Sequence, residues 1–258
     1  MKRWYYYIGD NMKILITGAS SGIGRDMARY LSSKENELIL VSSNKDKLES
    51  VSKALINSSV YVCDLSNSDN VNKLCEYILK EKPDFVINNA GFGAFGFYDE
   101  ISLDREIEMI NVNIVALHKI TKTCLEYMDN GHILNVSSSA GLMPGGPMLN
   151  TYYATKNYVR SYSLGLYKEL KKKNKNIHIS ILCPGPVNTN FNKVAIGTFS
   201  IKGLSSEYVA RYAIDKCLKN KLIIVPGFKV KLGIFFSRFL PTKLVLSILF
   251  KIQHRKVS

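Results

Sequence analysis

Tyr152 and Lys156 stand four residues apart in the run Tyr152-Tyr153-Ala154-Thr155-Lys156, a spacing that can make a phenol work as an acid. On a helix, residues i and i+4 share a face. A free tyrosine has a pKa of about 10 and transfers protons poorly at neutral pH. A cation beside it favours the phenolate and pulls that pKa toward the working range. The spacing alone is weak, because long helices produce it by chance, so the surrounding elements decide its meaning.

A glycine-rich turn follows the first apolar run of the chain. Ile14–Ile16 has a buried-strand pattern, and Thr17-Gly18-Ala19-Ser20-Ser21-Gly22-Ile23-Gly24 comes next and opens a helical pattern. Glycines there allow a tight turn and close approach of the backbone to a pyrophosphate at a helix N-terminus. An ordinary turn is the alternative, but the position directly after the first strand favours a nucleotide site.

Short apolar runs alternate with helical patterns along the chain. We expect strands at residues 13–17, 37–42, 59–63, 85–88, 132–137, 177–182 and 222–225. We expect helices near residues 23–33, 45–57, 69–80, 103–128, 151–173 and 206–220. This alternation predicts an α/β fold, a Rossmann-like three-layer sandwich with a central, mainly parallel seven-stranded sheet. Ligands of such sheets bind beyond the carboxyl ends of the strands.

Size and composition favour one domain in a reducing compartment. The chain has 258 residues, 46% of them hydrophobic, and shows no internal repeat or low-complexity linker. The five cysteines show neither pairing nor metal-ligand spacing, and the first residues lack a signal-peptide pattern. We therefore expect a cytoplasmic protein with reduced thiols. No metal site is expected, because the four histidines do not cluster with the cysteines.

The net charge of +14 is concentrated near the C-terminus, where no acidic residue follows Asp215. The basic residues beyond it are Lys216, Lys219, Lys221, Lys229, Lys231, Arg238, Lys243, Lys251, Arg255 and Lys256. No nucleic-acid reading motif accompanies them, so we do not expect a nucleic-acid partner. An anionic cofactor, substrate or membrane surface explains the charge at least as well.

Several motifs together resemble the short-chain dehydrogenase/reductase family, in its single-domain subgroup. They occur in the family's order and approximate spacing over roughly residues 12–220, and they are Thr17–Gly24, Asn88-Asn89-Ala90-Gly91, Asn113, Ser138, the Tyr152/Lys156 pair and Pro184-Gly185. The resemblance implies an NAD(P)-dependent oxidoreductase that acts on CH–OH and C=O groups. A non-catalytic nucleotide-sensing protein on the same fold is the alternative. The retained tyrosine and lysine argue against it.

The resemblance also implies catalytic roles. Tyr152 would be the general acid, giving its proton to the carbonyl oxygen as hydride arrives from the nicotinamide. Lys156 would lower the pKa of that tyrosine and hold the nicotinamide ribose. Ser138 would hydrogen-bond the substrate oxygen. Asn113 would position a proton-relay water within its helix.

Neighbouring residues compete for these roles. Ser137 and Ser139 flank the chosen serine, which stands three residues before Gly141 as the family's serine does. Asn111 competes with the chosen asparagine, and its alternative role is that of a solvated helix residue. Tyr153 points about 100° away from the catalytic tyrosine around a helix, so we expect it to pack in the core or the pocket.

By the same resemblance, a nicotinamide cofactor would lie along the turns after the strands. The residues implied around its pyrophosphate and nearby ribose are Gly18, Ser20, Ser21, Gly22, Ile23 and Gly24. Those implied at the adenine and along the ribose are Asp64, Leu65, Asn89, Ala90 and Gly91, with Asn88 bracing the sheet. Those implied near the nicotinamide are Tyr152, Lys156, Pro184, Gly185, Val187 and Thr189.

The end of the second strand bears on the choice between NADP and NAD. NAD binding generally uses an acidic residue there, whereas a 2′-phosphate repels one. The chain reads Val41-Ser42-Ser43-Asn44-Lys45, with no acid. The arginine that NADP-preferring relatives often carry in place of Ser43 is also missing. Ser43, Asn44 and Lys45 could still bond a phosphate. We expect NADP, with NAD as the alternative.

Apolar residues are expected around the substrate. They are Phe92, Phe95, Phe97, Leu142, Met143 and Leu149, together with a segment at residues 190–205 that caps the substrate in the family. Such walls suit a hydrophobic ketone or acyl carbonyl better than a free sugar. Core packing is the alternative role for each aromatic residue.

Three parts are expected along the chain: a leader of uncertain status at residues 1–11, a catalytic domain at 12–228 and a basic amphipathic extension at 229–258. Apolar residues recur at helical spacing in the extension, on both sides of Pro241. Charged residues interrupt it too often for a membrane span. It would lie on an anionic membrane as a hairpin, or pack over the substrate pocket or another subunit.

The expected partners are a small-molecule carbonyl or alcohol substrate and further copies of the chain. Relatives pair through the two long helices that we place near residues 103–128 and 151–173, which implies a homodimer or homotetramer. The expected location is the cytoplasm, with peripheral attachment to a membrane, as in a reductase of lipid metabolism, as the alternative.

Overall fold

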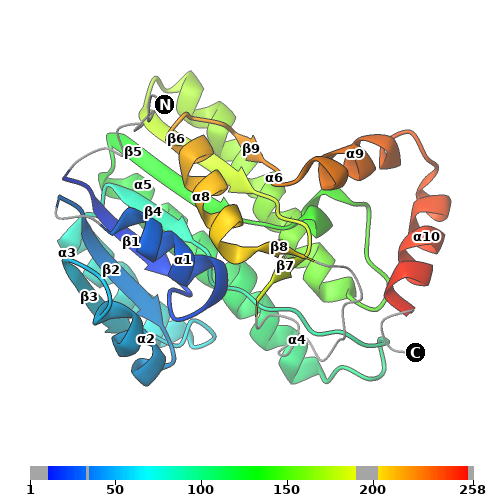
Figure 1. Cartoon of the computed structure of the whole chain (residues 1–258), viewed down its shortest axis with the longest axis horizontal. Helices are drawn as coiled ribbons and strands as arrows, with labels where there is room; N and C mark the ends of the chain where they lie inside the picture. Colours follow the sequence, from blue (N-terminus) through cyan, green and yellow to red (C-terminus); the bar gives the residue numbers. More distant parts are fainter. Residues whose placement is uncertain (1–10, 33–34, 190–202, 255–258) are drawn as a thin grey trace, which may run out of the picture.

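A computed structural model describes residues 11–32, 35–189 and 203–254 (Figure 1). Its central sheet has seven strands, all parallel, in the order β3-β2-β1-β4-β5-β6-β9. The strands are β1 (Lys13–Thr17), β2 (Glu37–Ser42), β3 (Ser58–Val62), β4 (Phe85–Asn88), β5 (Asn130–Val136), β6 (Asn176–Leu182) and β9 (Ile223–Ile224). A separate two-stranded sheet pairs β7 (Val187–Asn188) with β8 (Leu204–Ser205). The predicted Rossmann-like architecture is confirmed.

Helices cover both faces of the sheet (Figure 1). One layer contains α1 (Gly22–Leu31), α2 (Lys45–Ser52) and α8 (Ser206–Cys217). The other contains α3 (Ser68–Glu81), α5 (Leu117–Tyr127) and α6 (Asn150–Lys172). The remaining helices are α4 (Leu103–Ile110), the π-helix η1 (Asn111–Ala116), the 3₁₀ helix η2 (Ser139–Leu142), α9 (Phe228–Ser237) and α10 (Thr242–His254).

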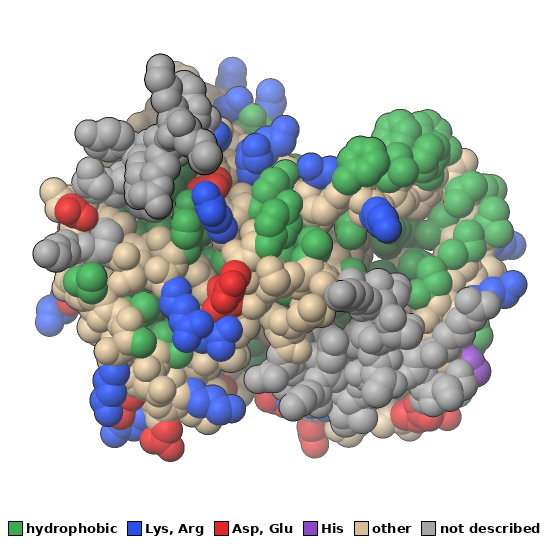
Figure 2. Space-filling model, viewed as in Figure 1, with side chains coloured by type: hydrophobic (Ala, Val, Ile, Leu, Met, Phe, Trp, Pro, Cys, Tyr) green, Lys and Arg blue, Asp and Glu red, His purple; other side chains and the backbone are tan. Residues whose placement is uncertain are grey.

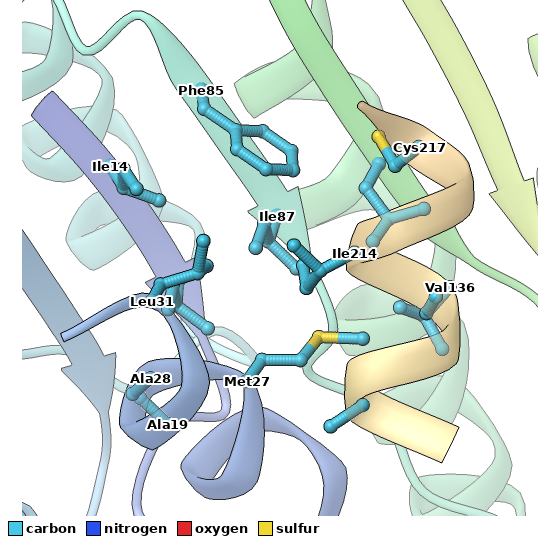
Figure 3. Close-up of a cluster of buried hydrophobic side chains, with 14 of the residues drawn as sticks. Ile14, Ala19, Met27, Ala28, Leu31, Phe85, Ile87, Val136, Ile214 and Cys217 are labelled. Atoms are coloured by element: carbon cyan, nitrogen blue, oxygen red, sulfur yellow. The ribbon is translucent and has the colours of Figure 1, made fainter. Parts of the chain in front are cut away.

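Side-chain alternation along the strands divides the core into two halves. Ile14 of β1 packs in a cluster with Met27 of α1 and Ile214 of α8 (Figure 3), and all three are fully buried. Its neighbour Leu15 points to the opposite face, where it packs with Leu74 of α3. Since both faces are covered by helices, the inner strands carry buried apolar side chains on both faces, as is typical of a parallel sheet.

The strand order reverses between β1 and β4. From β1 the chain proceeds outward through β2 and β3, and from β4 it proceeds in the other direction through β5 and β6. Loops on the two sides of this point diverge and leave a crevice at the carboxyl ends of the strands. The motifs after β1, β4 and β5 therefore meet in one place.

Two predicted helices differ from the observed ones. The helix expected at 103–128 is present as three consecutive pieces, and its middle piece is the π-helix η1, a local widening that is frequent at functional sites. The helix expected at 45–57 ends at Ser52. Beyond it the chain turns at Asn57, whose φ of 51° is left-handed, to enter β3.

Helices α9 and α10 extend from the sheet at the side where α6 begins (Figure 1). Ile234 of α9 and Val245 and Gln253 of α10 are buried against the rest of the chain. Among the described residues, no helix combines the length and apolarity needed to cross a membrane.

Candidate active site

Hydrogen bonds join the turn after β1 to the loop after β4. Gly18 and Gly22 adopt left-handed φ values of 67° and 55°, which glycine takes without strain. Thr17 Oγ1 accepts hydrogen bonds from the backbone N–H groups of Asn89 and Ala90, both at 3.0 Å. Asn89 Nδ2 donates to the Thr17 carbonyl oxygen at 3.0 Å. Hydrogen bonds therefore join the two predicted cofactor-binding loops to each other.

The N-terminus of α1 is suited to an anion. Ser21 is its N-cap residue and makes no side-chain capping bond within the described part of the chain, and the first turn contains no acidic residue. The N–H groups of that turn therefore remain available, and the helix dipole favours negative charge there. Gly24 lies behind this turn, where a Cβ atom would overlap Gly18 and Asn89. Its role is close packing.

At the end of β2, the residues predicted to bind a cofactor phosphate have different surroundings. Ser20 and Ser42 share a hydrogen bond at 2.8 Å, and Ser43 lines the cleft. Asn44 instead caps α2, where its Oδ1 accepts from the Lys47 backbone at 2.9 Å. Lys45 forms an ion pair with Glu49 at 3.8 Å. Of the three expected phosphate ligands, Asn44 and Lys45 are thus engaged within α2.

Asp64 and Leu65, which are expected near the adenine, both line the cleft. Asp64 Oδ1 accepts hydrogen bonds from the Ser66 backbone at 2.9 Å and the Ser66 hydroxyl at 2.8 Å. The side chain of Asn88 faces the sheet interior and donates to Thr121 and Asn135, at 3.1 and 2.9 Å. The expectation that Asn88 braces the sheet is confirmed.

The end of β5 and the first turns of α6 bring the expected catalytic side chains together. Lys156 is buried, and its Nζ donates to the Val136 carbonyl oxygen at 3.0 Å. The same Nζ lies 5.8 Å from the centre of the Tyr152 ring. Ser138 hydrogen-bonds Tyr152 and lies with it on the cleft wall.

Burial determines how these groups titrate. Removal from water raises the pKa of Tyr152 to about 12, and the hydrogen bond from Ser138 offsets only part of this. Burial also lowers the pKa of Lys156 to about 8. In the chain by itself, the pKa of Tyr152 is therefore displaced away from neutrality, opposite to the predicted direction. Loss of hydration around the phenol outweighs the effect of its neighbours.

The two serines beside Ser138 have distinct surroundings. Ser137 Oγ donates to the Lys156 carbonyl oxygen at 2.7 Å, so it holds α6 against β5. Ser139 begins η2, and its backbone N–H donates to the Pro184 carbonyl oxygen at 2.8 Å. Ser138 hydrogen-bonds the catalytic tyrosine candidate, which supports the choice made from the sequence.

Asn113 lies in η1, is buried, and does not line the cleft. Its Nδ2 donates to the Phe92 carbonyl oxygen at 2.9 Å and to Thr155 Oγ1 at 3.0 Å, while its Oδ1 accepts from the Phe92 backbone at 3.1 Å. The side chain therefore joins the loop after β4 to α6. Asn113 positions Gly91, since a Cβ atom at Gly91 would lie 2.8 Å from Asn113 Oδ1 and 3.0 Å from Lys156 Nζ.

Most expected site residues line one cleft of about 460 Å³. They are Gly18, Ser20, Ser21, Gly22, Ile23, Ser43, Asp64, Leu65, Asn89, Ala90, Gly91, Ser138, Tyr152, Lys156, Pro184, Gly185, Val187 and Thr189. Gly24, Asn44 and Asn113 support the cleft from outside. The family segment expected to cap the substrate lies largely outside the described residues, which resume at Gly203.

Gln253 of α10 also lines the cleft, and the sequence did not indicate it. It is 4% exposed, and its Nε2 donates to the Tyr153 hydroxyl at 3.2 Å. Tyr153 packs with Ala140 and Leu149, as expected for a pocket residue. The apolar spacing of the tail predicted a helix, but a single glutamine within it carries no pattern that links it to Tyr153.

Comparison with known proteins identifies the family. The model of the short chain dehydrogenase family matches residues 12–196, more than half of the chain. The chain belongs to this family. It is therefore an oxidoreductase with an NAD(P)-binding Rossmann fold, and the resemblance noted in its motifs is confirmed.

Two relatives cover most of the chain. Human 17-beta-hydroxysteroid dehydrogenase 13 is 34% identical over 245 residues, which cover 89% of this chain and 79% of the relative. The very-long-chain 3-oxoacyl-CoA reductase of Anas platyrhynchos is 30% identical over 259 aligned positions, covering 92% of this chain and 78% of the relative.

Solved structures share the fold. A short chain dehydrogenase/reductase from Burkholderia phymatum, solved in complex with NAD, superimposes with a TM-score of 0.79 at 24% identity, covering 87% of this chain and 92% of the other. A short-chain dehydrogenase from Sphingobium yanoikuyae in complex with NADPH gives 0.79 at 23% identity, covering 88% and 93%.

Proposed function

We propose that the chain is an NADP-dependent carbonyl reductase/alcohol dehydrogenase whose substrate is a hydrophobic ketone or acyl carbonyl. The observation that carries this proposal is that Ser138, Tyr152 and Lys156 line the same cleft as the N-terminus of α1. The bound nicotinamide would supply or accept the hydride. The cleft-lining residues of the turns after β1, β3 and β4 would hold the cofactor, with its pyrophosphate at Ser21 and Gly22.

The chain's own groups would handle the proton and the developing charge. Tyr152, protonated at neutral pH, donates its phenolic proton to the carbonyl oxygen in the reduction direction. Ser138 orients that oxygen by a hydrogen bond. The Lys156 ammonium stabilises the phenolate left on Tyr152 and holds the cofactor ribose. Asn113 keeps Gly91 and α6 in register, and a proton-relay water beside it would return a proton to the site.

The preference for NADP rests on the end of β2. Ser43 lines the cleft there, and no acidic side chain stands at residues 42–45 to repel a 2′-phosphate. The engagement of Asn44 and Lys45 within α2 leaves Ser43 and Ser42 as the neutral donors. Initial rates with NADPH and NADH at equal low concentration test this. Faster turnover with NADH would overturn the preference.

The proposed substrate class follows from the apolar end of the cleft. Phe92, Leu149 and Tyr153 line it, and a neighbouring cavity of about 350 Å³ is bordered by Phe97, Met148, Leu246 and Phe250 among others. Such walls favour an apolar chain or ring over a sugar. The two relatives named for a steroid and a very-long-chain acyl substrate are consistent with this and favour a role in lipid metabolism.

A panel of carbonyl compounds tests the class. NADPH oxidation is measured with a steroid ketone, a long-chain 3-oxoacyl thioester, a short aldehyde and an aldose. We expect kcat/KM to rise with apolar area. The highest kcat/KM for the aldose would contradict the proposed substrate class without affecting the assignment of Tyr152.

The proposed assembly is a homodimer or homotetramer that pairs through α4, α5 and α6. Leu103 and Ile107 of α4 are 71% and 46% exposed, and Tyr158 of α6 is 36% exposed. Burial of these side chains would favour association. Light scattering after size-exclusion chromatography measures the mass directly, and a monomeric mass would contradict the proposed assembly.

In this proposal the catalytic domain spans residues 12–228. The extension at 229–258 belongs to the substrate-binding unit, since Gln253 lines the cleft.

A further inference from the structure

The outer face of α9 and α10 exposes many large apolar side chains. Exposed fractions reach 76% at Phe228 and 72% at Phe239. The set, which we call the α9–α10 face, comprises Phe228, Leu232, Phe235, Phe236, Phe239, Leu240, Leu244, Ile248 and Ile252. Figure 2 shows the hydrophobic side chains gathered over these two helices. Folded proteins rarely leave so large a contiguous apolar patch in water without a partner.

The two helices are held in place by their inner sides. Ile234, Val245 and Gln253 are buried, and Val230 packs so closely on Gly185 that a Cβ atom there would lie 2.7 Å from Val230 Cγ2. The exposed aromatic rings pack on one another, since Phe235 of α9 lies 5.6 Å from Phe236 and 5.2 Å from Phe239, just after the helix, between ring centres. The exposed apolar side chains thus belong to helices whose other sides are packed against the rest of the chain.

Basic side chains surround this face, and acidic ones are missing from it. Lys229, Lys231, Arg238, Lys243 and Lys251 are exposed on the two helices. The sequence contains no Asp or Glu after residue 215. The surface that an occupant must match is therefore apolar in its centre and positive around it.

This combination decides between the candidate occupants. In a symmetric pair, the same surface of each copy meets its equal, so a second copy on this face would bring positive charges together with no acidic residue to pair them. An anionic lipid surface offers an apolar layer beneath negative headgroups, which matches both features. Helices of 10 and 13 residues are too short to span a bilayer and would lie in its plane.

We propose that the α9–α10 face is a docking surface for an anionic membrane, with Phe235, Phe236 and Phe239 inserted among the acyl chains. The proposal rests on this surface and not on the substrate proposed above. It has one consequence for that substrate. Because the inner side of α10 lines the cleft through Gln253, a docked enzyme would hold its cleft next to the lipid from which an apolar substrate would come.

Vesicle flotation with the full chain tests the docking. Vesicles of phosphatidylcholine alone are compared with vesicles that contain phosphatidylserine as well, at low and at high salt. We expect binding to the anionic vesicles, which falls when salt is raised. Replacing Phe235, Phe236 and Phe239 by Ser should reduce the bound fraction at least tenfold. Equal recovery of wild type and this triple variant with anionic vesicles would overturn the proposal.

Matched variants separate the face from general effects. The control for the apolar set is Ile56→Ser with Leu79→Ser and Tyr208→Ser, three exposed apolar side chains outside the α9–α10 face and the proposed subunit interface, which should leave vesicle binding unchanged. For charge, Lys229→Gln with Arg238→Gln and Lys243→Gln should abolish the preference for anionic lipid. Lys168→Gln with Lys172→Gln and Lys173→Gln should retain it. Equal losses in both charge variants would mean non-specific attraction and would overturn the docking surface.

A site-specific probe remains informative even if a triple variant fails to fold. Phe239→Trp and Leu103→Trp place single reporters at side chains that are 72% and 71% exposed, in a chain whose native tryptophan is replaced by Trp4→Phe. Anionic vesicles with brominated acyl chains should quench only the reporter at 239. Quenching of both or neither contradicts the proposal. The molar mass gives a further test. If the changes at Phe235, Phe236 and Phe239 lowered the molar mass without affecting vesicle binding, the face would bind a second copy, which also contradicts the proposal.

Discussion

The turn between β1 and α1 and the α9–α10 pair both border the cleft, yet they use their residues in opposite ways. In the turn, Thr17 and Asn89 satisfy one another's backbone groups, and the apolar side chains of β1 are fully buried. In α9 and α10, apolar side chains face outward and Ile234, Val245 and Gln253 alone are buried. The first region is built around its own hydrogen bonds. The second region exposes large apolar side chains.

This difference suggests that the two regions have different functions. In the proposed function, the N–H groups of the turn bind the anionic cofactor, and the stability of the turn depends on how completely its polar groups are paired. The α9–α10 pair contributes one polar side chain to the cleft, and in our proposal its outer face binds a membrane. Changes in the turn should therefore alter folding and cofactor binding. Changes in the tail should alter substrate use or surface binding instead.

Thr17→Val gives the largest expected effect on stability. The substitution preserves shape but leaves the Ala90 N–H of this part-buried turn without its acceptor, while the Asn89 N–H keeps the Ile87 carbonyl oxygen at 3.1 Å. An unpaired group costs about 1–3 kcal/mol, so we expect a loss of stability of that size and weaker cofactor binding. Urea unfolding and calorimetry measure both. Thr242→Val, at the exposed start of α10, is the matched control and should change stability by less than about 0.5 kcal/mol.

The pH dependence of cofactor use sharpens the role of Lys156. Its pKa is lowered to about 8 by burial, so it is charged below that pH and neutral above it. The phenol of Tyr152, with a pKa raised to about 12, remains protonated throughout the same range. We expect kcat/KM for NADPH to be constant below pH 7 and to fall about tenfold per pH unit above 8. A profile that stays flat to pH 10 would show that Lys156 keeps an ordinary pKa.

Gln253→Leu gives the smallest expected effect and tests the tail. It removes the hydrogen bond to the Tyr153 hydroxyl at the substrate end of the cleft. We expect the KM for the carbonyl substrate to change by about threefold, with about 1 kcal/mol of lost stability and an unaltered Kd for NADPH. Ser247→Ala on the exposed side of α10 is the control. If the Kd for NADPH changed while the KM did not, the division between turn and tail would be wrong.

The sheet could be predicted from the sequence because both of its faces are buried. Strands such as 13–17 and 85–88 contain unbroken apolar runs at 14–16 and 85–87, and turn residues and helical patterns separate the strands. The grouping of the site residues was also predictable, since Ser138, Tyr152 and Lys156 follow strands or lie on a helix whose position the fold dictates.

Contacts between distant segments were not predictable. Asn44 caps α2 instead of lining the cleft, and its type suits either role. The direction of the Tyr152 pKa depends on how much water the folded cleft excludes, which spacing does not reveal. Gln253 meets Tyr153 across 100 positions of sequence. The apolar tail packs inward at a few residues and exposes the rest, and its periodicity was compatible with either arrangement.

The most direct test of the account is the turnover of Tyr152→Phe. With NADPH and the best carbonyl substrate from the panel, kcat should fall by about 10²–10⁴, because the phenolic proton donor is lost. The Kd for NADPH should stay within about twofold, and Tyr153→Phe should keep wild-type kcat. If Tyr152→Phe retained more than about a tenth of the wild-type kcat, another group would have to supply the proton. Tyr152 would then not be the general acid of this site.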